Sequence, residues 1–143
     1  MSPLAAYVLA AGELICEFQD GYQRSLLADL VGEPPRTMLL VYENISPGAA
    51  EVISTRSPGR NPVRVIAEGK SVHLIQEAGP SVMVTTLLAC ERTKRRSGER
   101  ICTRFRARHA WHFDRAALSN PDASFESQPT GASPGTCEPW RLD

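Results

Sequence analysis

The chain has 143 residues, with 16 Lys and Arg against 16 Asp and Glu, and 42% of its residues are hydrophobic. This length suits one domain, and an ordinary apolar content without persistent heptads excludes the collagen-like, wholly disordered and coiled-coil classes. The net charge of zero excludes a protein that attracts polyanions through its global field.

The first segment, residues 1–12, is apolar and rich in alanine. Ala and Leu favour a short helix, and the alternative is the remnant of a signal peptide without its basic start. The segment is too short to span a bilayer. We therefore expect no transmembrane segment here.

Between residues 13 and 114 the apolar residues recur with the period of two that is typical of β-strands. Gly- and Pro-containing turn signals separate the apolar runs. The predicted strands lie at residues 14–18, 22–30, 37–42, 50–55, 63–67, 72–76, 82–90 and 101–113. The run at 22–30 also fits one or two helical turns. The pattern predicts an all-β domain of about eight short antiparallel strands, a meander that forms a small barrel or sandwich.

The last of these runs, residues 101–113, alternates most regularly. Its odd-numbered positions include Phe105 and Trp111 and are predicted to face the core. Its even-numbered positions, which include Cys102 and three arginines, are predicted to face solvent. A helix would spread the large apolar side chains around its circumference, so the strand is favoured.

The residues after 114 change in composition and are rich in Pro, Gly and Ser, with no apolar period. Alone, such a segment would be a flexible coil. Cys137 and Trp140 indicate that its end is tied back to the body, with Trp140 covering an apolar surface. We expect an irregular C-terminal wrap over residues 115–143.

Four cysteines are widely spaced, with no C-x-x-C motif and no histidine nearby, which excludes the usual zinc-site spacing. Two disulfides are predicted, and hence an oxidising compartment, periplasmic or secreted. The alternative is four reduced, buried thiols in a cytosolic protein. The favoured pairing joins Cys90 to Cys102 and leaves Cys16 to pair with Cys137.

That pairing depends on an assumed register. If residues 82–90 pair with 101–113 around a five-residue turn, Cys90 lies directly opposite Cys102, and Leu87 lies opposite Phe105. Directly opposed residues have Cβ atoms about 4.5–5.5 Å apart, close enough to form a bridge. A slip of one residue would separate the two sulfur atoms.

Histidine and aspartate cluster near the end of the same run, at His109, His112 and Asp114. On a strand the two imidazoles point to opposite sides, so they cannot bind one ion together. We expect His109 to be hydrogen-bonded in the core and His112 to be a solvated partner of Asp114. A hydrolase or metal-dependent enzyme that uses these residues with His73 stays as the alternative, and no cofactor or metal is predicted.

The strongest signal is a basic stretch at residues 91–108. It holds eight basic residues against two glutamates, a net charge of +6, so the rest of the neutral chain carries −6. The basic residues are Arg92, Lys94, Arg95, Arg96, Arg100, Arg104, Arg106 and Arg108. Arginine makes planar bidentate contacts with carboxylate and phosphate. The alternative is a solvated edge whose arginines pair with acids on neighbouring strands and prevent aggregation.

Nucleic acid is not an expected partner. Single-strand binders interleave exposed aromatic and basic side chains, whereas the pleat of this strand sends rings and guanidinium groups to opposite faces. Phosphate-binding glycine loops are also absent from the sequence.

These features predict a non-catalytic, exported binding module. Its basic hairpin, with His112 nearby, would contact an acidic protein, an anionic glycan or lipid head groups. The general layout resembles periplasmic binding and lysozyme-inhibitor proteins in architecture alone, which implies an inhibitor-like function. A second alternative is a barrel that holds a small apolar ligand in its interior.

Overall fold

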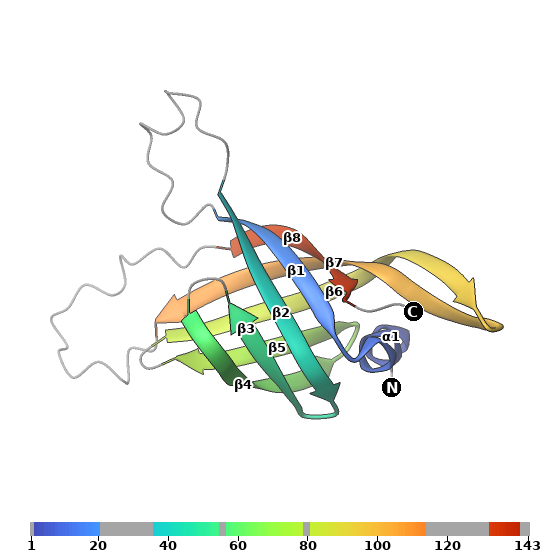
Figure 1. The fold of residues 1–143 in the computed structure, drawn as a ribbon, viewed down its shortest axis with the longest axis horizontal. Helices are drawn as coiled ribbons and strands as arrows, with labels where there is room; N and C mark the ends of the chain where they lie inside the picture. Colours follow the sequence, from blue (N-terminus) through green and yellow to red (C-terminus); the bar gives the residue numbers. More distant parts are fainter. Residues whose placement is uncertain (1, 21–35, 55–56, 79–80, 114–131, 141–143) are drawn as a thin grey trace, which may run out of the picture.

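The computed structural model describes residues 2–20, 36–54, 57–78, 81–113 and 132–140 (Figure 1). One helix precedes eight strands, and the strands form a closed barrel in chain order. The elements are α1 (Pro3–Ala11), β1 (Leu14–Asp20), β2 (Arg36–Ser46), β3 (Ala49–Ser54), β4 (Ser57–Glu68), β5 (Ser71–Ala78), β6 (Ser81–Arg96), β7 (Glu99–Phe113) and β8 (Ala132–Pro139). The predicted all-β meander is confirmed, and it is a barrel.

The barrel closes through β8, which pairs antiparallel with both β1 and β7. Cys137 lies opposite Cys16 in the β1–β8 register, and a disulfide joins them with 4.0 Å between their Cα atoms. The predicted tether is therefore confirmed. The expectation of an irregular wrap is wrong for residues 132–139, which form a strand. The predicted strand at 22–30 lies outside the described residues.

β8 could not be predicted as a strand because its sequence has no alternation of apolar and polar residues. Two neighbouring strands and the disulfide specify it instead. Gly135 is required by close approach, since a Cβ atom there would collide with the Glu17 carbonyl oxygen and the Phe18 ring. Trp140 follows β8, and 47% of it is exposed; that it covers an apolar surface stays a prediction.

The inner side of the barrel is filled by apolar side chains from its strands. The largest fully buried ones include Phe18 and Leu14 of β1, Leu87 of β6 and Phe105 of β7. The buried apolar residues form one cluster, which also includes three residues of α1. Burial of this cluster against the helix therefore fixes one end of the barrel.

The N-terminal segment takes the helical form that the sequence allowed. Ser2 caps α1, since its Oγ accepts a hydrogen bond of 3.2 Å from the Ala5 amide. Pro3 occupies the first turn, where its missing N–H costs nothing. Gly12 ends the helix with φ at +71°, a conformation that glycine adopts readily.

The β6–β7 hairpin has a different register from the predicted one. A two-residue turn at Ser97 and Gly98, both with positive φ, replaces the expected five-residue turn. Leu87 lies opposite Ala107, not opposite Phe105. Three register irregularities near the disulfide, each placing one extra residue on β6 or β7, shift the pairing further.

The disulfide between Cys90 and Cys102 is nevertheless confirmed, with 6.0 Å between the Cα atoms. The two residues are not directly opposed, because Cys90 pairs with Phe105 and Cys102 pairs with Thr93. Cys102 was expected to face solvent, but it is buried among residues that include those of α1. The helix covers this part of β7, which strand alternation alone could not indicate.

Candidate functional site

The β6–β7 hairpin projects beyond the barrel as a two-stranded ribbon. β6 pairs with β5 only up to Leu87, and β7 pairs with β8 only from Phe105 onward. Residues 88–104, which we call the distal ribbon, therefore pair only across the hairpin itself. Figure 1 shows the distal ribbon extending past the end of the barrel that carries α1. All residues from 91 to 100 are exposed.

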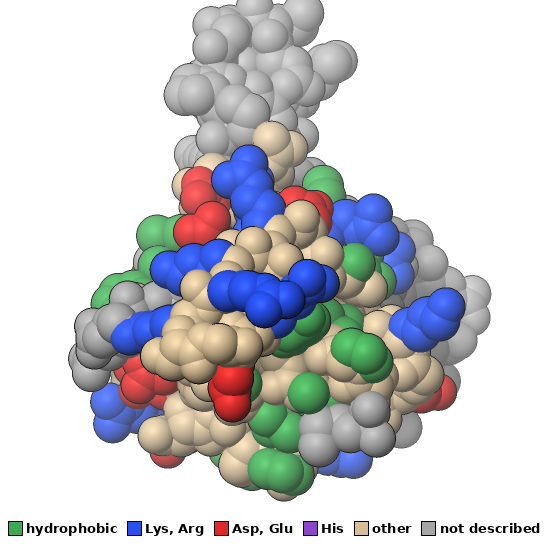
Figure 2. All heavy atoms as spheres, turned by 90° about the vertical axis from the view of Figure 1, so that its right-hand side faces the viewer, with side chains coloured by type: hydrophobic (Ala, Val, Ile, Leu, Met, Phe, Trp, Pro, Cys, Tyr) green, Lys and Arg blue, Asp and Glu red, His purple; other side chains and the backbone are tan. Residues whose placement is uncertain are grey.

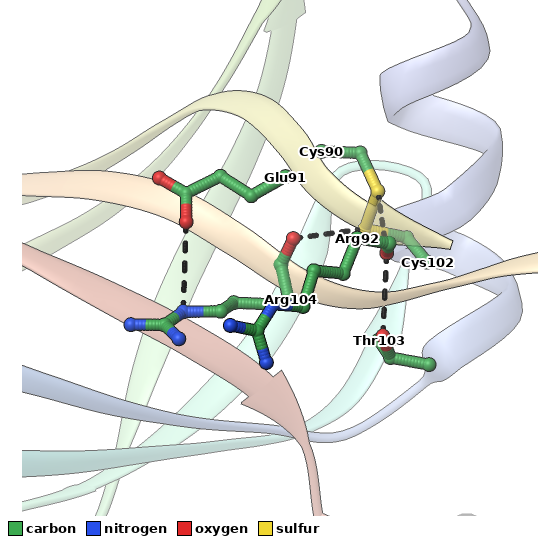
Figure 3. The surroundings of a disulfide bond; sticks show 6 residues. All are labelled: Cys90, Glu91, Arg92, Cys102, Thr103 and Arg104. Atoms are coloured by element: carbon green, nitrogen blue, oxygen red, sulfur yellow. Dashed lines mark hydrogen bonds and ion pairs between the residues drawn. A yellow bond between two sulfur atoms is a disulfide. The ribbon is translucent and has the colours of Figure 1, made fainter. Parts of the chain in front are cut away.

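The base of the distal ribbon is held by the Cys90–Cys102 disulfide (Figure 3). Thr103 Oγ1 donates a hydrogen bond of 3.3 Å to the Arg92 carbonyl oxygen across the strands. The Sγ atom of Cys90 lies 3.1 Å from the same oxygen, a close contact because a half-cystine has no thiol proton. A free two-stranded hairpin is marginally stable, so this cross-link stabilises the extended form of the distal ribbon together with the cross-strand pairing.

Like charges face one another along the distal ribbon. Arg95 pairs directly with Arg100, and Arg92 pairs with Arg104. Directly opposed like charges destabilise an antiparallel pair. The turn-proximal pair, Arg96 with Glu99, is the opposite-charge exception. Cations are therefore concentrated here at a cost in local stability.

Few of these cations have an acidic partner. Among the described residues of the basic stretch, the ion pair is between Arg104 Nε and Glu91 Oε2, at 3.5 Å (Figure 3). This arginine was predicted to be solvated, and it is half-buried. The expectation that the stretch is a salt-bridged edge thus describes Arg104 but not its neighbours.

Arg106 and Arg108 lie on the barrel wall, where the predicted alternation holds: both are exposed, and Ala107 between them is buried. Their cross-strand neighbours carry no acid. Arg106 lies between Ala89 and Thr136, and Arg108 lies between Thr86 and Pro134. These two arginines form a second basic group, separate from the distal ribbon.

The predicted binding residues that the structure describes thus fall into two groups, and their role in binding stays a prediction. Arg92, Arg95, Arg96 and Arg100 lie on the distal ribbon, with Arg104 at its base. The side chain of His112, like Asp114, lies outside the described parts of the chain. Figure 2, which views the ribbon end of the molecule, shows Lys and Arg side chains gathered across this face.

His109 is buried in the barrel and hydrogen-bonded, as predicted. Its Nδ1 lies 2.9 Å from Thr85 Oγ1, which lies 2.6 Å from the Tyr42 hydroxyl. Burial raises the pKa of Tyr42 far above its ordinary value, and the hydrogen bond to Thr85 offsets this in part. All three polar groups are buried in the core of the barrel.

His73, the other described histidine of the enzyme alternative, has different partners from His109. Nδ1 of His73 lies 2.9 Å from Thr86 Oγ1, and its Nε2 lies 3.8 Å from Glu68 Oε2. Within the described ranges, no group of three or more His, Cys, Asp or Glu side chains could hold a metal ion. The described residues therefore supply no metal site, and the enzyme alternative, which also involves His112 and Asp114, stays a hypothesis.

A second feature at the ribbon end was missed by the sequence analysis. A cavity of about 230 Å³ lies beside α1, and all its lining residues are apolar or glycine. It is lined by Ala5, Val8 and Leu9 of α1, Val65 and Ala67 of β4, Val72 of β5, and the β2–β3 turn. The apolar first segment was the sequence signal for this cavity. The position of that segment against β4 and β5, however, depends on the closed barrel.

No family model, curated protein or solved structure matches the chain. Nor does the described part of the chain contain a helix with the length and apolarity needed to cross a membrane. The two disulfides are compatible with an oxidising compartment.

Proposed function

We propose that the protein is a non-catalytic, exported binding module that uses the distal ribbon to contact an anionic partner. The partner is an acidic protein, an anionic glycan or a surface of lipid head groups. The observation that carries the proposal is the set of exposed, unpaired cations on a cross-linked ribbon outside the barrel.

Stability does not account for these cations. A few charges are enough to protect a solvated strand edge from aggregation. If the arginines served only that purpose, we would expect them to pair with acidic side chains, which would lower their mutual repulsion. Here Arg95 and Arg100 are directly opposed, an arrangement that is unfavourable until an anion lies between or over them. An anionic partner would relieve this repulsion, and arginine can bind its carboxylates or phosphates in a bidentate manner.

The disulfide adds a second argument. A ribbon fixed in an extended form loses less conformational entropy on binding than a flexible loop would. Cross-linking at Cys90 and Cys102 leaves the charged outer residues 91–100 exposed. A cross-link of this kind also suits a periplasmic or secreted protein.

The test is capture on immobilised polyanions, heparin for glycans and polyglutamate for acidic proteins, together with anionic vesicles, at low and high salt. We expect capture at low salt and release as salt screens the charges. The variant Arg95→Glu/Arg96→Glu/Arg100→Glu should lose most of the capture.

A matched control changes the same number of charges elsewhere. Arg36, Arg60 and Arg64 lie on β2 and β4, and Arg36→Glu/Arg60→Glu/Arg64→Glu has the same net charge as the ribbon variant. Capture should be retained in this control to a much greater extent. If none of the three polyanions is bound, or if both variants lose capture equally, the proposed function is wrong.

A further inference from the structure

We infer that the α1 end of the barrel docks on an anionic lipid surface, with the distal ribbon on the head groups and the α1 cavity accepting one acyl chain. This inference rests on the proposed function and selects one partner class from it. Such docking requires a charged surface and an apolar surface at the same end of the molecule.

The first surface is charged. Arg92, Arg95, Arg96 and Arg100 are exposed on the distal ribbon, and Figure 1 places the ribbon and α1 at the same end of the barrel. Each Lys or Arg near an anionic membrane surface contributes a factor of about five in affinity. A ribbon with several such cations is complementary to phosphate head groups.

The second surface is apolar and open. Around the cavity, Leu9 and Val65 are half-buried, and Pro47 and Ala67 are exposed. Figure 2 shows hydrophobic side chains exposed beside the Lys and Arg side chains on this face. A soluble polyanion would contact the cations but would leave this apolar rim in water, whereas a lipid offers both an anion and a hydrocarbon chain.

The cavity has the size and the apolar lining for an acyl chain and not for a bulky ligand. Its volume of about 230 Å³ exceeds the roughly 150 Å³ of an apolar cavity that holds benzene. It is smaller than the roughly 300–1,000 Å³ of sites for drug-sized ligands. All its lining residues are apolar or glycine, so a segment of acyl chain meets no polar side chain there.

The walls of the cavity are already ordered. The Val65 amide donates a hydrogen bond of 3.1 Å to the Gly48 carbonyl oxygen, which joins β4 to the β2–β3 turn. On the helical side, Ala5 and Val8 are buried against the barrel core. An acyl chain can therefore enter between α1 and β4 without prior unfolding of either wall of the cavity.

The experiment is flotation of the whole protein with vesicles of phosphatidylcholine alone or mixed equally with phosphatidylglycerol. We expect binding to the mixed vesicles and none to the neutral ones. Arg95→Glu/Arg100→Glu should weaken binding to the mixed vesicles by roughly a hundredfold or more. The control Arg60→Glu/Arg64→Glu, with the same net charge, should weaken it far less.

A second variant tests the cavity separately. Ala67→Phe places a ring at the mouth and should weaken vesicle binding by about tenfold while leaving heparin capture unchanged. Its control is Ala49→Phe, an exposed alanine of β3 outside the cavity lining. Circular dichroism and the melting temperature establish that each variant is folded, and Val65→Trp serves as the filling variant if Ala67→Phe does not fold.

The outcomes separate the two proposals. Capture by heparin or polyglutamate without flotation on anionic vesicles would overturn the lipid inference and leave the proposed function in place. Flotation that Ala67→Phe and Val65→Trp do not weaken would overturn the acyl-chain site. Failure to bind any polyanion would overturn both proposals.

Discussion

The barrel and the distal ribbon are built from the same two long strands, yet different forces hold them. Within the barrel, β6 and β7 each have a partner strand on both sides, and Leu87 and Phe105 are fully buried. Beyond those residues each strand has one partner, and residues 91–100 are all exposed. The barrel is stabilised by apolar burial, whereas the distal ribbon depends on one disulfide and cross-strand hydrogen bonds.

The two regions differ in whether stability explains their side chains. A strand that serves the core has side chains chosen by packing, and its outward face carries scattered charges. The distal ribbon instead opposes arginine with arginine at two positions. This contrast is the reason for assigning the binding role to the ribbon and not to the barrel wall.

The largest expected effect comes from the disulfide of the barrel. Cys16 and Cys137 are separated by 121 residues, and the chain-entropy model gives a loss of about 5 kcal/mol when a loop of this length is opened. The double variant Cys16→Ala/Cys137→Ala should therefore lose most of its free energy of unfolding in urea titrations. A loss below about 1 kcal/mol would show that strand pairing alone holds β8 in place.

The disulfide of the distal ribbon should act locally. Cys90→Ala/Cys102→Ala removes a cross-link over 12 residues, for which the same model gives about 3 kcal/mol. Because the ribbon can open without the barrel, we expect faster amide hydrogen exchange at residues 92–103 and a loss of global unfolding free energy below this upper limit of about 3 kcal/mol. A global loss as large as that of the Cys16–Cys137 variant would contradict the division into two regions.

More of the barrel than of the distal ribbon could be predicted from the sequence. Period-two alternation identified the strand at 101–113 and the burial of His109, because packing on one face leaves a regular pattern. The register was wrong at the turn, which has two residues instead of five, and again at the bulges, since an extra residue such as Glu91 has no signature of its own in a single sequence. β8 was missed for a related reason: its strand form depends on its neighbours and on Gly135, not on its own apolar residues.

The excess of basic residues at the candidate site could be predicted from the sequence, but its form as a projecting ribbon could not. No sequence pattern indicates that residues 88–104 leave the barrel, because that depends on where β5 and β8 stop pairing. It also could not place α1 beside β4 and β5. Both facts belong to the closed barrel, which determines the two surfaces at the ribbon end.

A smaller effect is expected inside the barrel at Tyr42. Tyr42→Phe removes the hydrogen bond of 2.6 Å to Thr85, while Thr85 retains His109 as a partner. The cost should be about 1 kcal/mol at neutral pH, measured by urea unfolding. No change in the ribbon's hydrogen exchange should accompany it.

Alkaline pH sharpens this test. Burial raises the pKa of Tyr42 in the folded protein, so above the ordinary tyrosine pKa of about 10 the unfolded chain loses a proton that the folded chain keeps. Stability should then fall as pH rises. This fall should be shallower in Tyr42→Phe, and equal slopes in the two proteins would contradict the burial of the hydroxyl.

The smallest expected effect on stability is the most informative about function. Arg95→Glu replaces the opposed Arg95 and Arg100 with an opposite-charge pair, which should slow hydrogen exchange in the distal ribbon by the equivalent of at most about 0.5 kcal/mol. The same change should weaken capture on anionic vesicles by several-fold. Glu91→Gln is the comparison, because it breaks the existing ion pair with Arg104, leaves the opposed Arg92 and Arg104 unchanged, and should loosen the ribbon slightly. If Arg95→Glu destabilised the ribbon as Glu91→Gln does, the arginines would be structural, and their mutual repulsion would not explain anion binding.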